Sequence, residues 1–299
     1  MRILLLGANG QLGRELRQSL APLGELVALD RHGNQGLCGD LGDAAGIANT
    51  LRELRPDLIV NAAAHTAVDR AESEPELAHA INAVAPGIMA EEAARLGSWL
   101  VHYSTDYVFD GTGNTPWRES DSPAPLNVYG RSKLAGERAI EASGCRHLIL
   151  RTSWVYGRHG HNFIKTVLRL ATERDTLRII DDQIGTPTSA DLIAEVSAQA
   201  IAKARDNPDL GGLYHLVARG ETSWYHYARR IVDEARARGM ALTVEAIEPV
   251  ATRDYPTPAA RPLNSRLDTG KLRRAFDLHT PPWQQGVAQL IQELTGQTP

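Results

Sequence analysis

The sequence has few cysteines and no long apolar run. Cys38 and Cys145 are its only two cysteines in 299 residues, and they form no Cys-x-x-Cys pair. We therefore expect reduced thiols in a cytoplasmic protein rather than a disulfide scaffold. The apolar run Ile3–Leu6 ends at Gly7 and is too short for a secretory signal. No other run approaches the roughly 18 apolar residues of a membrane-spanning helix, so no membrane association is expected.

A large excess of charge of one sign is also missing. The 32 Lys and Arg residues nearly balance the 36 Asp and Glu residues, for a formal net charge of −4. This balance offers no general attraction for the phosphates of a nucleic acid, and we expect no nucleic-acid partner. The length of 299 residues suits one large α/β domain, or two smaller ones that share a cleft.

The first half of the chain alternates short apolar runs with amphipathic stretches. This alternation predicts βαβ units around a parallel sheet, a Rossmann-type doubly wound α/β fold. Strands are expected at Ile3–Leu6, Leu26–Leu29, Asp57–Ala63, Trp99–Ser104 and His147–Thr152. Helices are expected at Gln11–Leu20, Ala44–Leu54, Pro75–Leu96 and Val128–Ala142, with a polar, Gly- and Pro-containing loop at Asp110–Pro125.

After about residue 155 the alternation loosens. Helical patterns occur at Asn162–Glu173, Ala190–Ala204, Ser223–Arg238 and Trp283–Leu294, with a short strand at Leu213–Val217. We expect residues 1–155 to form a dinucleotide-binding domain. Residues 156–299 are expected to form a smaller α/β lobe that holds the substrate, with some elements returning to the main sheet.

A glycine-rich segment lies between the first predicted strand and the first predicted helix. Gly7, Gly10 and Gly13 form a Gly-x-x-Gly-x-x-Gly motif there. Glycine is required where backbone turns tightly and approaches a pyrophosphate, and the N–H groups at the start of the next helix bind phosphates. A glycine turn without a ligand would share the motif, but its strand–loop–helix placement favours a dinucleotide.

Acidic residues beyond this loop bear on the coenzyme. Asp30 ends the second predicted strand, where a carboxylate accepts the hydroxyls of an adenosine ribose. Arg31 follows it and is able to tolerate a 2′-phosphate, so NADH and NADPH both remain open. Asp40 and Leu41 form a polar-apolar pair suited to flank an adenine ring, although a solvated loop aspartate fits the pattern equally well.

Three residues form a candidate catalytic group. Tyr129 and Lys133 occupy one helix face at a spacing of one turn, and Thr105 stands at the carboxyl end of a strand, where ligands of such sheets bind. A tyrosine has an ordinary pKa of about 10, so an ammonium nearby is needed to favour its phenolate. By itself the Tyr/Lys pair would be read as an exposed pair; the hydroxyl of Thr105 makes proton transfer to a carbonyl the better interpretation.

The chain resembles the extended short-chain dehydrogenases/reductases and, within them, the dTDP-4-dehydrorhamnose reductase family. The similarity extends over essentially the whole chain. It is carried by the glycine loop, Asn61-Ala62-Ala63-Ala64-His65-Thr66, Ser104-Thr105-Asp106, Tyr129-x-x-x-Lys133, Arg151-Thr152-Ser153-Trp154, Gln183-x-Gly185-x-Pro187-Thr188 and Arg261-Pro262-Leu263-Asn264-Ser265.

The resemblance implies reduction of the C4 keto group of dTDP-4-dehydro-L-rhamnose by NADPH or NADH, the last step toward dTDP-L-rhamnose for surface polysaccharide such as lipopolysaccharide O-antigen. It implies that Tyr129 donates the proton, Lys133 binds coenzyme ribose, and Thr105 polarises the carbonyl. Asp106 and Trp154 would contact the dTDP-sugar, although Trp154 also suits a protein core. The coenzyme would be lined by Gly7, Gly10, Gln11, Leu12, Gly13, Asp30, Asp40, Leu41, Ala64, His65 and Thr66.

Other members of the superfamily remain as alternatives. Similar sugar-nucleotide dehydratases carry Thr-Asp-Glu, whereas this chain has Tyr107 in place of the glutamate, which favours reduction without elimination. A 4-epimerase and a non-catalytic binding subunit share parts of the pattern. The resemblance further implies Mg²⁺ at the interface of a homodimer, with Glu15, Asp191 and Glu293 as ligands. Asp191 is shorter than the glutamate expected there, and solvated surface acids are the simpler interpretation.

Overall fold

The main sheet has six strands, all parallel, in the order β10-β5-β4-β3-β1-β2. The computed structural model describes residues 1–296. The strands are β1 (Arg2–Leu6), β2 (Glu25–Leu29), β3 (Leu58–Asn61), β4 (Trp99–Thr105), β5 (Arg146–Thr152) and β10 (Gly212–His215). The chain winds outward from β1 in one direction and then from β3 in the other. This places a topological switch point, where ligands of such sheets bind, between β1 and β3.

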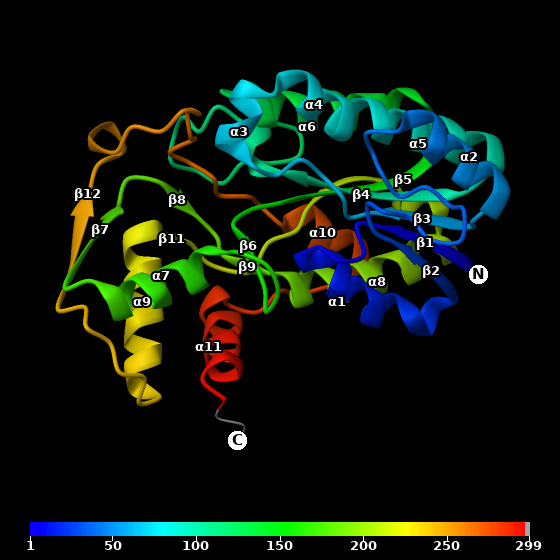
Figure 1. Cartoon of the computed structure of the whole chain (residues 1–299). Coiled ribbons are helices and arrows are strands. Elements are labelled where there is room, and N and C mark those ends of the chain that lie inside the picture. Colours follow the sequence, from blue (N-terminus) through cyan, green and yellow to red (C-terminus); the bar gives the residue numbers. More distant parts are fainter. Residues whose placement is uncertain (297–299) are drawn as a thin grey trace.

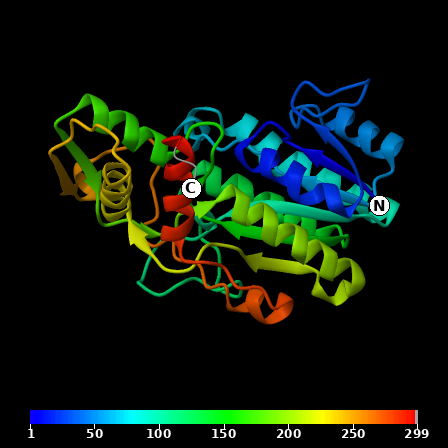
Figure 2. The same ribbon diagram turned by 90° about the horizontal axis from the view of Figure 1, so that it is seen from below.

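Helices cover both faces of this sheet (Figure 1). On one face lie α1 (Gln11–Leu20) and α8 (Ala190–Asp206), which pack against each other (Figure 2). On the other lie α2 (Ala44–Leu54), α5 (Ala85–Leu96) and α6 (Val128–Ala142). Alternate strand residues serve the two faces, with Leu5 beside Leu16 of α1, and Leu4 beside Ile47 of α2. The predicted Rossmann-type doubly wound fold is confirmed.

The segment predicted as one helix over Pro75–Leu96 is helical throughout but contains a π-helical turn. It follows α3 (Val68–Ser73) and comprises α4 (Pro75–His79), a π-helical turn η2 (Ala80–Val84) and α5. A π turn inserts a residue into the helix and is often found at functional sites. Here the turn carries Asn82, whose side chain is almost completely buried and bonds to backbone outside the helix. Helical periodicity alone does not reveal this turn.

Part of the second half of the chain forms a smaller lobe beside the sheet, whereas α8 and β10 belong to the main sheet layer (Figure 1). In the lobe, strand β7 (Thr176–Ile180) pairs in parallel with β12 (Ala246–Val250), and β8 (Ile184–Gly185) pairs antiparallel with β11 (Thr222–Ser223). The helices α7 (Phe163–Glu173), α9 (Trp224–Ala237) and α11 (Trp283–Leu294) pack around them. The remaining elements are β6 (Val155–Tyr156), β9 (Thr188–Ser189), α10 (Gly270–Phe276) and the 3₁₀ turns η1 (Ala21–Leu23), η3 (Asp106–Val108), η4 (Pro208–Leu210) and η5 (Thr252–Asp254).

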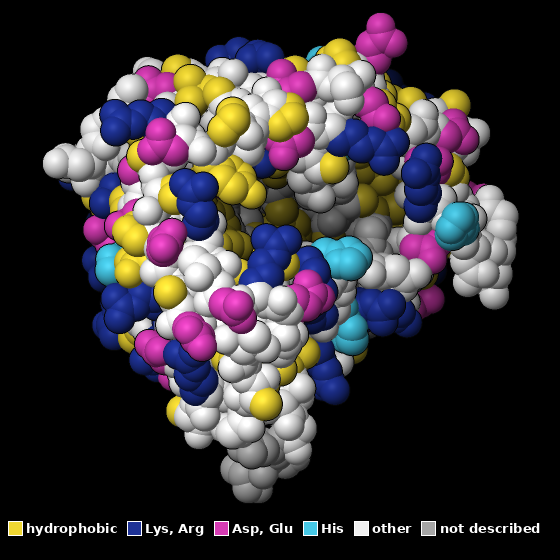
Figure 3. Space-filling model, turned by 60° about the vertical axis from the view of Figure 1, so that its left-hand side comes forward, with side chains coloured by type: hydrophobic (Ala, Val, Ile, Leu, Met, Phe, Trp, Pro, Cys, Tyr) yellow, Lys and Arg dark blue, Asp and Glu magenta, His cyan; other side chains and the backbone are white. Residues whose placement is uncertain are grey.

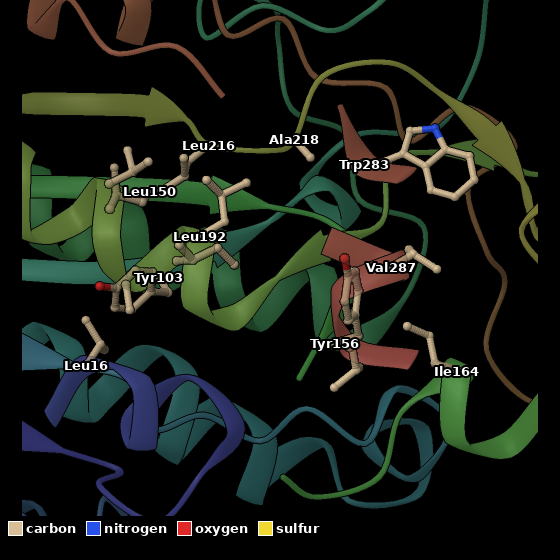
Figure 4. Close-up of a cluster of buried hydrophobic side chains, with 14 of the residues drawn as sticks. Leu16, Tyr103, Leu150, Tyr156, Ile164, Leu192, Leu216, Ala218, Trp283 and Val287 are labelled. Carbon is tan, nitrogen blue, oxygen red and sulfur yellow. The ribbon is translucent and has the colours of Figure 1, made fainter. Parts of the chain in front are cut away.

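One hydrophobic core joins the sheet to the lobe. Leu16 and Leu192, from the two helices under the sheet, belong to the same buried cluster as Tyr156, Ile164 and Val287 from the second half (Figure 4). Furthermore, β10 extends the main sheet by pairing with β5. The two halves therefore share packing rather than only a linker. No helix within residues 1–296 has both the length and the apolar composition needed to cross a membrane.

Candidate active site

The glycine loop lies at the carboxyl edge of the sheet and has no room for side chains. Gly7 has a φ of +82°, and a Cβ atom there would lie 2.7 Å from the backbone nitrogen of Ala63, beyond β3. A Cβ atom at Gly13 would collide with the carbonyl oxygen of Gly7. Glycine is thus required at both positions by the backbone conformation and by close approach. The loop has the shape that a pyrophosphate-binding turn needs.

The start of α1 supplies hydrogen-bond donors beside this loop. Gly10 is the N-cap residue and has no side chain to satisfy them, and the first helical hydrogen bond runs from Arg14 N–H to the Gly10 carbonyl over 3.1 Å. The N–H groups of Gln11, Leu12 and Gly13 consequently have no acceptor within the helix. Such a helix start attracts phosphate through its N–H groups and its dipole. These residues fit a dinucleotide.

The structure places Asp30 next to the glycine loop. The N–H groups of Gly7 and Ala8 both donate to the Leu29 carbonyl, which fixes the end of β2 beside the loop. The Asp30 carboxylate accepts hydrogen bonds from Asn9 Nδ2 at 2.5 Å and from the His32 N–H at 2.8 Å. Asp30 thereby occupies the edge where an adenosine ribose is held in such folds.

Asp40 and Leu41 have different environments. The Asp40 carboxylate accepts from the Gly42 N–H at 2.9 Å and lies 3.3 Å from the exposed guanidinium of Arg31. Leu41 is 4% exposed and belongs to the core under α2. The two residues therefore form a turn beside Asp30. Asp40 supplies its polar group, and Leu41 fixes it by packing into the core.

The segment after β3 is held by a residue that sequence reasoning missed. Asn82 accepts a hydrogen bond from the His65 N–H at 2.9 Å and donates one to the His65 carbonyl at 3.0 Å. It also donates to the Ser132 hydroxyl of α6 at 3.0 Å. His65 and Ala64 are half-buried at this edge, while Thr66 is exposed. The only signal in the sequence was an amide side chain within an apolar helical stretch.

Tyr129 is positioned by contacts at the start of α6. Asn127 caps the helix by accepting from the Gly130 N–H at 2.8 Å, and its amide group donates to the Ala260 carbonyl at 2.8 Å. The Glu72 carboxylate accepts from the Val128 N–H at 2.7 Å. An N-cap of this kind fixes the first turn, which carries Tyr129. Residue Tyr129 is half-buried as a whole, and it lies on the helix face that meets the end of β4.

Thr105 and Asp106 form one side of the tyrosine. The Thr105 hydroxyl donates to Asp106 Oδ1 at 3.1 Å, accepts from the Tyr107 N–H at 3.2 Å, and hydrogen bonds with the phenol of Tyr129. Burial raises the pKa of Tyr129 to about 12, while the Thr105 hydrogen bond opposes that rise. Burial likewise raises the pKa of Asp106 to about 7, against hydrogen bonds from Ser265 and Thr105. Asp106 Oδ2 has no partner within residues 1–296.

Lys133 forms the other side but is turned toward β4. It is 2% exposed, and its ammonium nitrogen lies 2.6 Å from the Tyr103 carbonyl oxygen and 3.0 Å from His102 Nε2. Burial lowers the pKa of Lys133 to about 8, and Glu137 opposes that change. The sequence predicted that Lys133 would favour the phenolate of Tyr129, yet the pKa of Tyr129 is raised. The reason is that burial outweighs the stabilisation by Thr105, and the amino group of Lys133 is directed elsewhere.

The segment 261–265 contacts residues around Tyr129. Arg261 pairs with Asp69 of α3 through two hydrogen bonds, at 2.8 and 3.1 Å, and holds the pKa of that carboxyl below its ordinary range. Arg261 also hydrogen bonds with Tyr107, whose ring meets that of Tyr129 edge-on at 5.7 Å between centroids. Ser265 donates its N–H to the Ile184 carbonyl at 2.7 Å and so ties the segment to the lobe.

Trp154 faces the lobe. Its φ is +47°, and its indole stacks on that of Trp224 at 3.7 Å between ring centroids. A Cβ atom at Gly185 would come within 2.6 Å of the Trp154 ring, so glycine is needed there. Trp154 is half-buried rather than fully enclosed in the core. The face turned forward in Figure 3 is hollowed near its centre, with hydrophobic side chains in the hollow and cationic and His side chains at its rim.

The three acids expected to bind Mg²⁺, Glu15 of α1 with Asp191 and Glu293, are close enough for their charges to interact. Burial, followed by the charges of Asp191 and Glu293, raises the pKa of Glu15, while His159 and Arg158 oppose this. Within residues 1–296, however, no group of three or more His, Cys, Asp or Glu side chains has an arrangement that could hold a metal ion. The resemblance implied a site shared by the two chains of a homodimer, so Mg²⁺ binding by these acids stays a prediction.

Comparison with known proteins agrees with this geometry. Residues 1–296 match the family model of the RmlD substrate binding domain. A dTDP-4-dehydrorhamnose reductase of Salmonella typhimurium is 55% identical over 98% of both chains. Solved structures of dTDP-4-dehydrorhamnose reductases from Clostridium acetobutylicum and, with NADP, from Bacillus anthracis are both 35% identical. Each covers 98% of this chain and 99% of its own, with TM-scores of 0.87 and 0.86 respectively. The chain therefore belongs to the RmlD substrate binding domain family.

Proposed function

We propose that the protein reduces the C4 keto group of dTDP-4-dehydro-L-rhamnose to give dTDP-L-rhamnose, with NADPH or NADH as reductant. The observation that carries this proposal is the grouping of Thr105, Tyr129 and Lys133 beside a dinucleotide-binding glycine loop. It occurs in a chain that matches dTDP-4-dehydrorhamnose reductases over nearly its full length. The reaction is an NAD(P)H-dependent reduction that ends in a secondary alcohol.

The residues divide the work of the reaction. The bound coenzyme supplies the hydride. The Thr105 hydroxyl donates a hydrogen bond to the substrate carbonyl and stabilises the negative charge that develops there. Tyr129 protonates the resulting alkoxide as a general acid. Lys133 holds the coenzyme ribose, and its positive charge favours the phenolate that Tyr129 becomes.

The sugar nucleotide is proposed to lie between the two halves of the chain. Residues 1–155 would bind the coenzyme, and residues 156–299 would hold the dTDP-sugar. The half-buried indole of Trp154 suits packing against a sugar or a base. The free carboxylate oxygen of Asp106 has no protein partner within residues 1–296 and is available for a sugar hydroxyl.

Tyr107 argues for reduction rather than elimination. Its phenol hydrogen bonds with Arg261, and burial raises its pKa above the ordinary value, so it stays protonated and cannot remove a proton from the substrate. Incubation with dTDP-4-dehydro-L-rhamnose and excess NADPH tests the proposal. Oxidation of one NADPH for each dTDP-L-rhamnose formed supports a reductase. Turnover without net oxidation would indicate a 4-epimerase, and tight binding without turnover a binding subunit.

Asp30 and Arg31 are proposed to decide between the coenzymes. Asp30 accepts a ribose hydroxyl of NADH but repels the 2′-phosphate of NADPH, which Arg31 offsets. Replacement of Asp30 by Ala is therefore expected to weaken NADH more than NADPH. Fluorescence titration with both coenzymes measures the ratio of affinities. Equal losses would show that Asp30 does not touch the ribose.

We further propose that the product supplies surface polysaccharide and that the enzyme works in the cytoplasm, in keeping with its two unpaired cysteines.

A homodimer is proposed to bring the acids Glu15, Asp191 and Glu293 of two chains together. Only such a pairing would give Mg²⁺ enough oxygen ligands. Light scattering with Mg²⁺ and with a chelator tests both points. A monomer under both conditions would exclude them.

A further inference from the structure

His102 lies beside the catalytic lysine but was not among the predicted site residues. It belongs to β4, whose residues are all buried, and is itself 1% exposed. Val101 and Tyr103 point to the face covered by α1 and α8. The alternation of the strand therefore directs His102 to the opposite face, where α6 carries Lys133. Its two ring nitrogens contact Lys133 on one side and Asn61 on the other.

The hydrogen bonds around His102 determine which ring nitrogen carries the proton. Asn61 Oδ1 accepts from the Ala63 N–H at 3.1 Å, so the amino group of Asn61 is the part that faces His102 Nδ1, at 3.1 Å. An amino group only donates, and Nδ1 must therefore accept. Turning the Asn61 amide over would oppose its amino group to the Ala63 N–H and leave that donor unsatisfied.

Lys133 must then accept a hydrogen bond from His102. A neutral imidazole has one N–H, which must now be on Nε2 and points at the Lys133 nitrogen 3.0 Å away. A lysine nitrogen accepts a hydrogen bond only as the neutral amine. As an amine it also donates to the Tyr103 carbonyl, 2.6 Å away, so both of its contacts are satisfied hydrogen bonds. An ammonium in the same place would oppose one donor to another.

The groups around Lys133 also favour its neutral form. Burial is the main cause that lowers the pKa of both Lys133 and His102, so it favours the neutral form of each. Glu137, one turn along α6, is the group that favours the ammonium. Its carboxylate is already paired with Arg151 of β5 through bonds of 2.9 and 2.6 Å. On β4 itself, the nearest ionisable side chain is the phenol of Tyr103, which bonds to Ser197 on the other face.

We propose that His102 is a positioning residue that holds Lys133 as a neutral amine before coenzyme binds, so that binding of the coenzyme is coupled to uptake of one proton by Lys133. The proton comes from solvent and adds to the lysine nitrogen, which then turns from the His102 N–H toward the ribose oxygens. Above its lowered pKa, the lysine is thereby charged only when the coenzyme is present. This inference rests on the proposed function, because it requires a nicotinamide coenzyme at this edge.

Calorimetric titration with NADP⁺ in buffers of different ionisation enthalpy measures the proton uptake. At pH 9, above the lowered pKa of Lys133, we expect uptake approaching one proton per NADP⁺ bound. The variant His102→Gln places an amide oxygen near the position of Nε2, which stabilises the ammonium before binding. Uptake should then fall toward zero, and the pH at which NADP⁺ affinity begins to decrease should move upward by about one unit or more.

His215→Gln is a matched control. His215 is also fully buried and lies in the same sheet, but its Nδ1 faces the Trp117 carbonyl at 3.1 Å, away from Lys133. This variant should retain the proton uptake of the unmodified protein. Uptake near zero in the unmodified protein, or equal uptake in the protein and in His102→Gln, would overturn the inference.

A measurement without any variant decides the matter if His102→Gln does not fold. ¹⁵N NMR of the histidines in the protein without coenzyme is expected to show His102 protonated at Nε2 and not at Nδ1. The opposite tautomer would overturn the inference. Failure of NADP⁺ to bind would instead contradict the proposed function, and the tautomer would still test the role of His102.

Discussion

The two sides of Tyr129 are built differently. On one side, Thr105 and Asp106 are neighbours in sequence at the end of β4. They hydrogen bond to each other, and Thr105 also hydrogen bonds with the phenol. On the other side, Lys133 comes from the same helix as the tyrosine, yet its nitrogen is bound to His102 and Tyr103. The first side fixes the phenol for the substrate. On the second side, Lys133 acts on the tyrosine only after its nitrogen leaves His102. We infer that coenzyme binding causes this change.

The largest effect is expected for Tyr129→Phe, which removes the residue that both sides serve. Loss of a general acid typically lowers the rate 10²- to 10⁴-fold. Coenzyme affinity should be nearly unchanged, because only the hydroxyl is deleted. Steady-state rates and coenzyme titration provide the two readouts. Near-normal turnover would eliminate Tyr129 as the proton donor.

Thr105→Val tests the side that is already formed. It removes the donor to the substrate carbonyl and the hydrogen bond that opposes the rise of the Tyr129 pKa. A lost donor of this type costs about 10²- to 10³-fold in kcat. Thr105→Ser keeps the hydroxyl and should recover most of the rate. If valine and serine gave equal rates, the hydroxyl would have no part in catalysis.

Lys133→Ala tests the side that awaits the coenzyme. Charge-assisted hydrogen bonds to the ribose contribute roughly 1.5–3 kcal/mol, so the affinity for NADP⁺ should fall roughly 10- to 150-fold. The pH at which Tyr129 loses its proton should also move upward, because no cation is present to favour its phenolate. Unlike Tyr129→Phe, this variant damages both binding and chemistry. Normal coenzyme affinity together with an unshifted pH–rate profile would make Lys133 an ordinary buried residue.

The last prediction concerns the stability of the fold rather than catalysis, and it is made for Asp106. Its carboxyl pKa is raised from 3.8 to about 7, so the folded protein is favoured at low pH and loses stability as the pH rises through 7. Asp106→Asn has no such loss. Relative to the unmodified protein, its free energy of unfolding should rise between pH 4 and pH 8, by at most about 4 kcal/mol. Urea unfolding at both pH values measures the difference. A gap independent of pH would show that Asp106 is not buried as a carboxylic acid.

Much of the N-terminal half could be predicted from sequence because its signals are local. Glycine spacing, strand alternation and helical periodicity each depend on residues that are close in the chain. The pairing of β7 with β12 could not be predicted, since it joins strands separated by about seventy residues and both are short. The π turn at Asn82 was missed because its cause, the hydrogen bonds to His65, lies outside the helix.

The same distinction holds for the site. Tyr129 and Lys133 were identified by their spacing, and that spacing does place them on one helix. It did not show where the lysine nitrogen points, because that depends on His102 from a different element. Arg261 pairs with Asp69 across 192 positions, a contact that no local pattern specifies. Glu15 and Asp191 lie close enough for their charges to interact, and Mg²⁺ binding by these carboxylates stays a prediction.

The most direct test follows the ionisation of Tyr129 itself. ¹³C NMR of protein labelled at the ring carbon that bears the tyrosine hydroxyl, assigned with Tyr129→Phe, reports the phenol in the protein alone and with saturating NADP⁺. Without coenzyme, Tyr129 should stay protonated through the pH range in which the fold persists, in keeping with a pKa of about 12. With NADP⁺ bound, the charged Lys133 should bring its titration down by at least about one pH unit. The same titration curve in both samples would contradict the account.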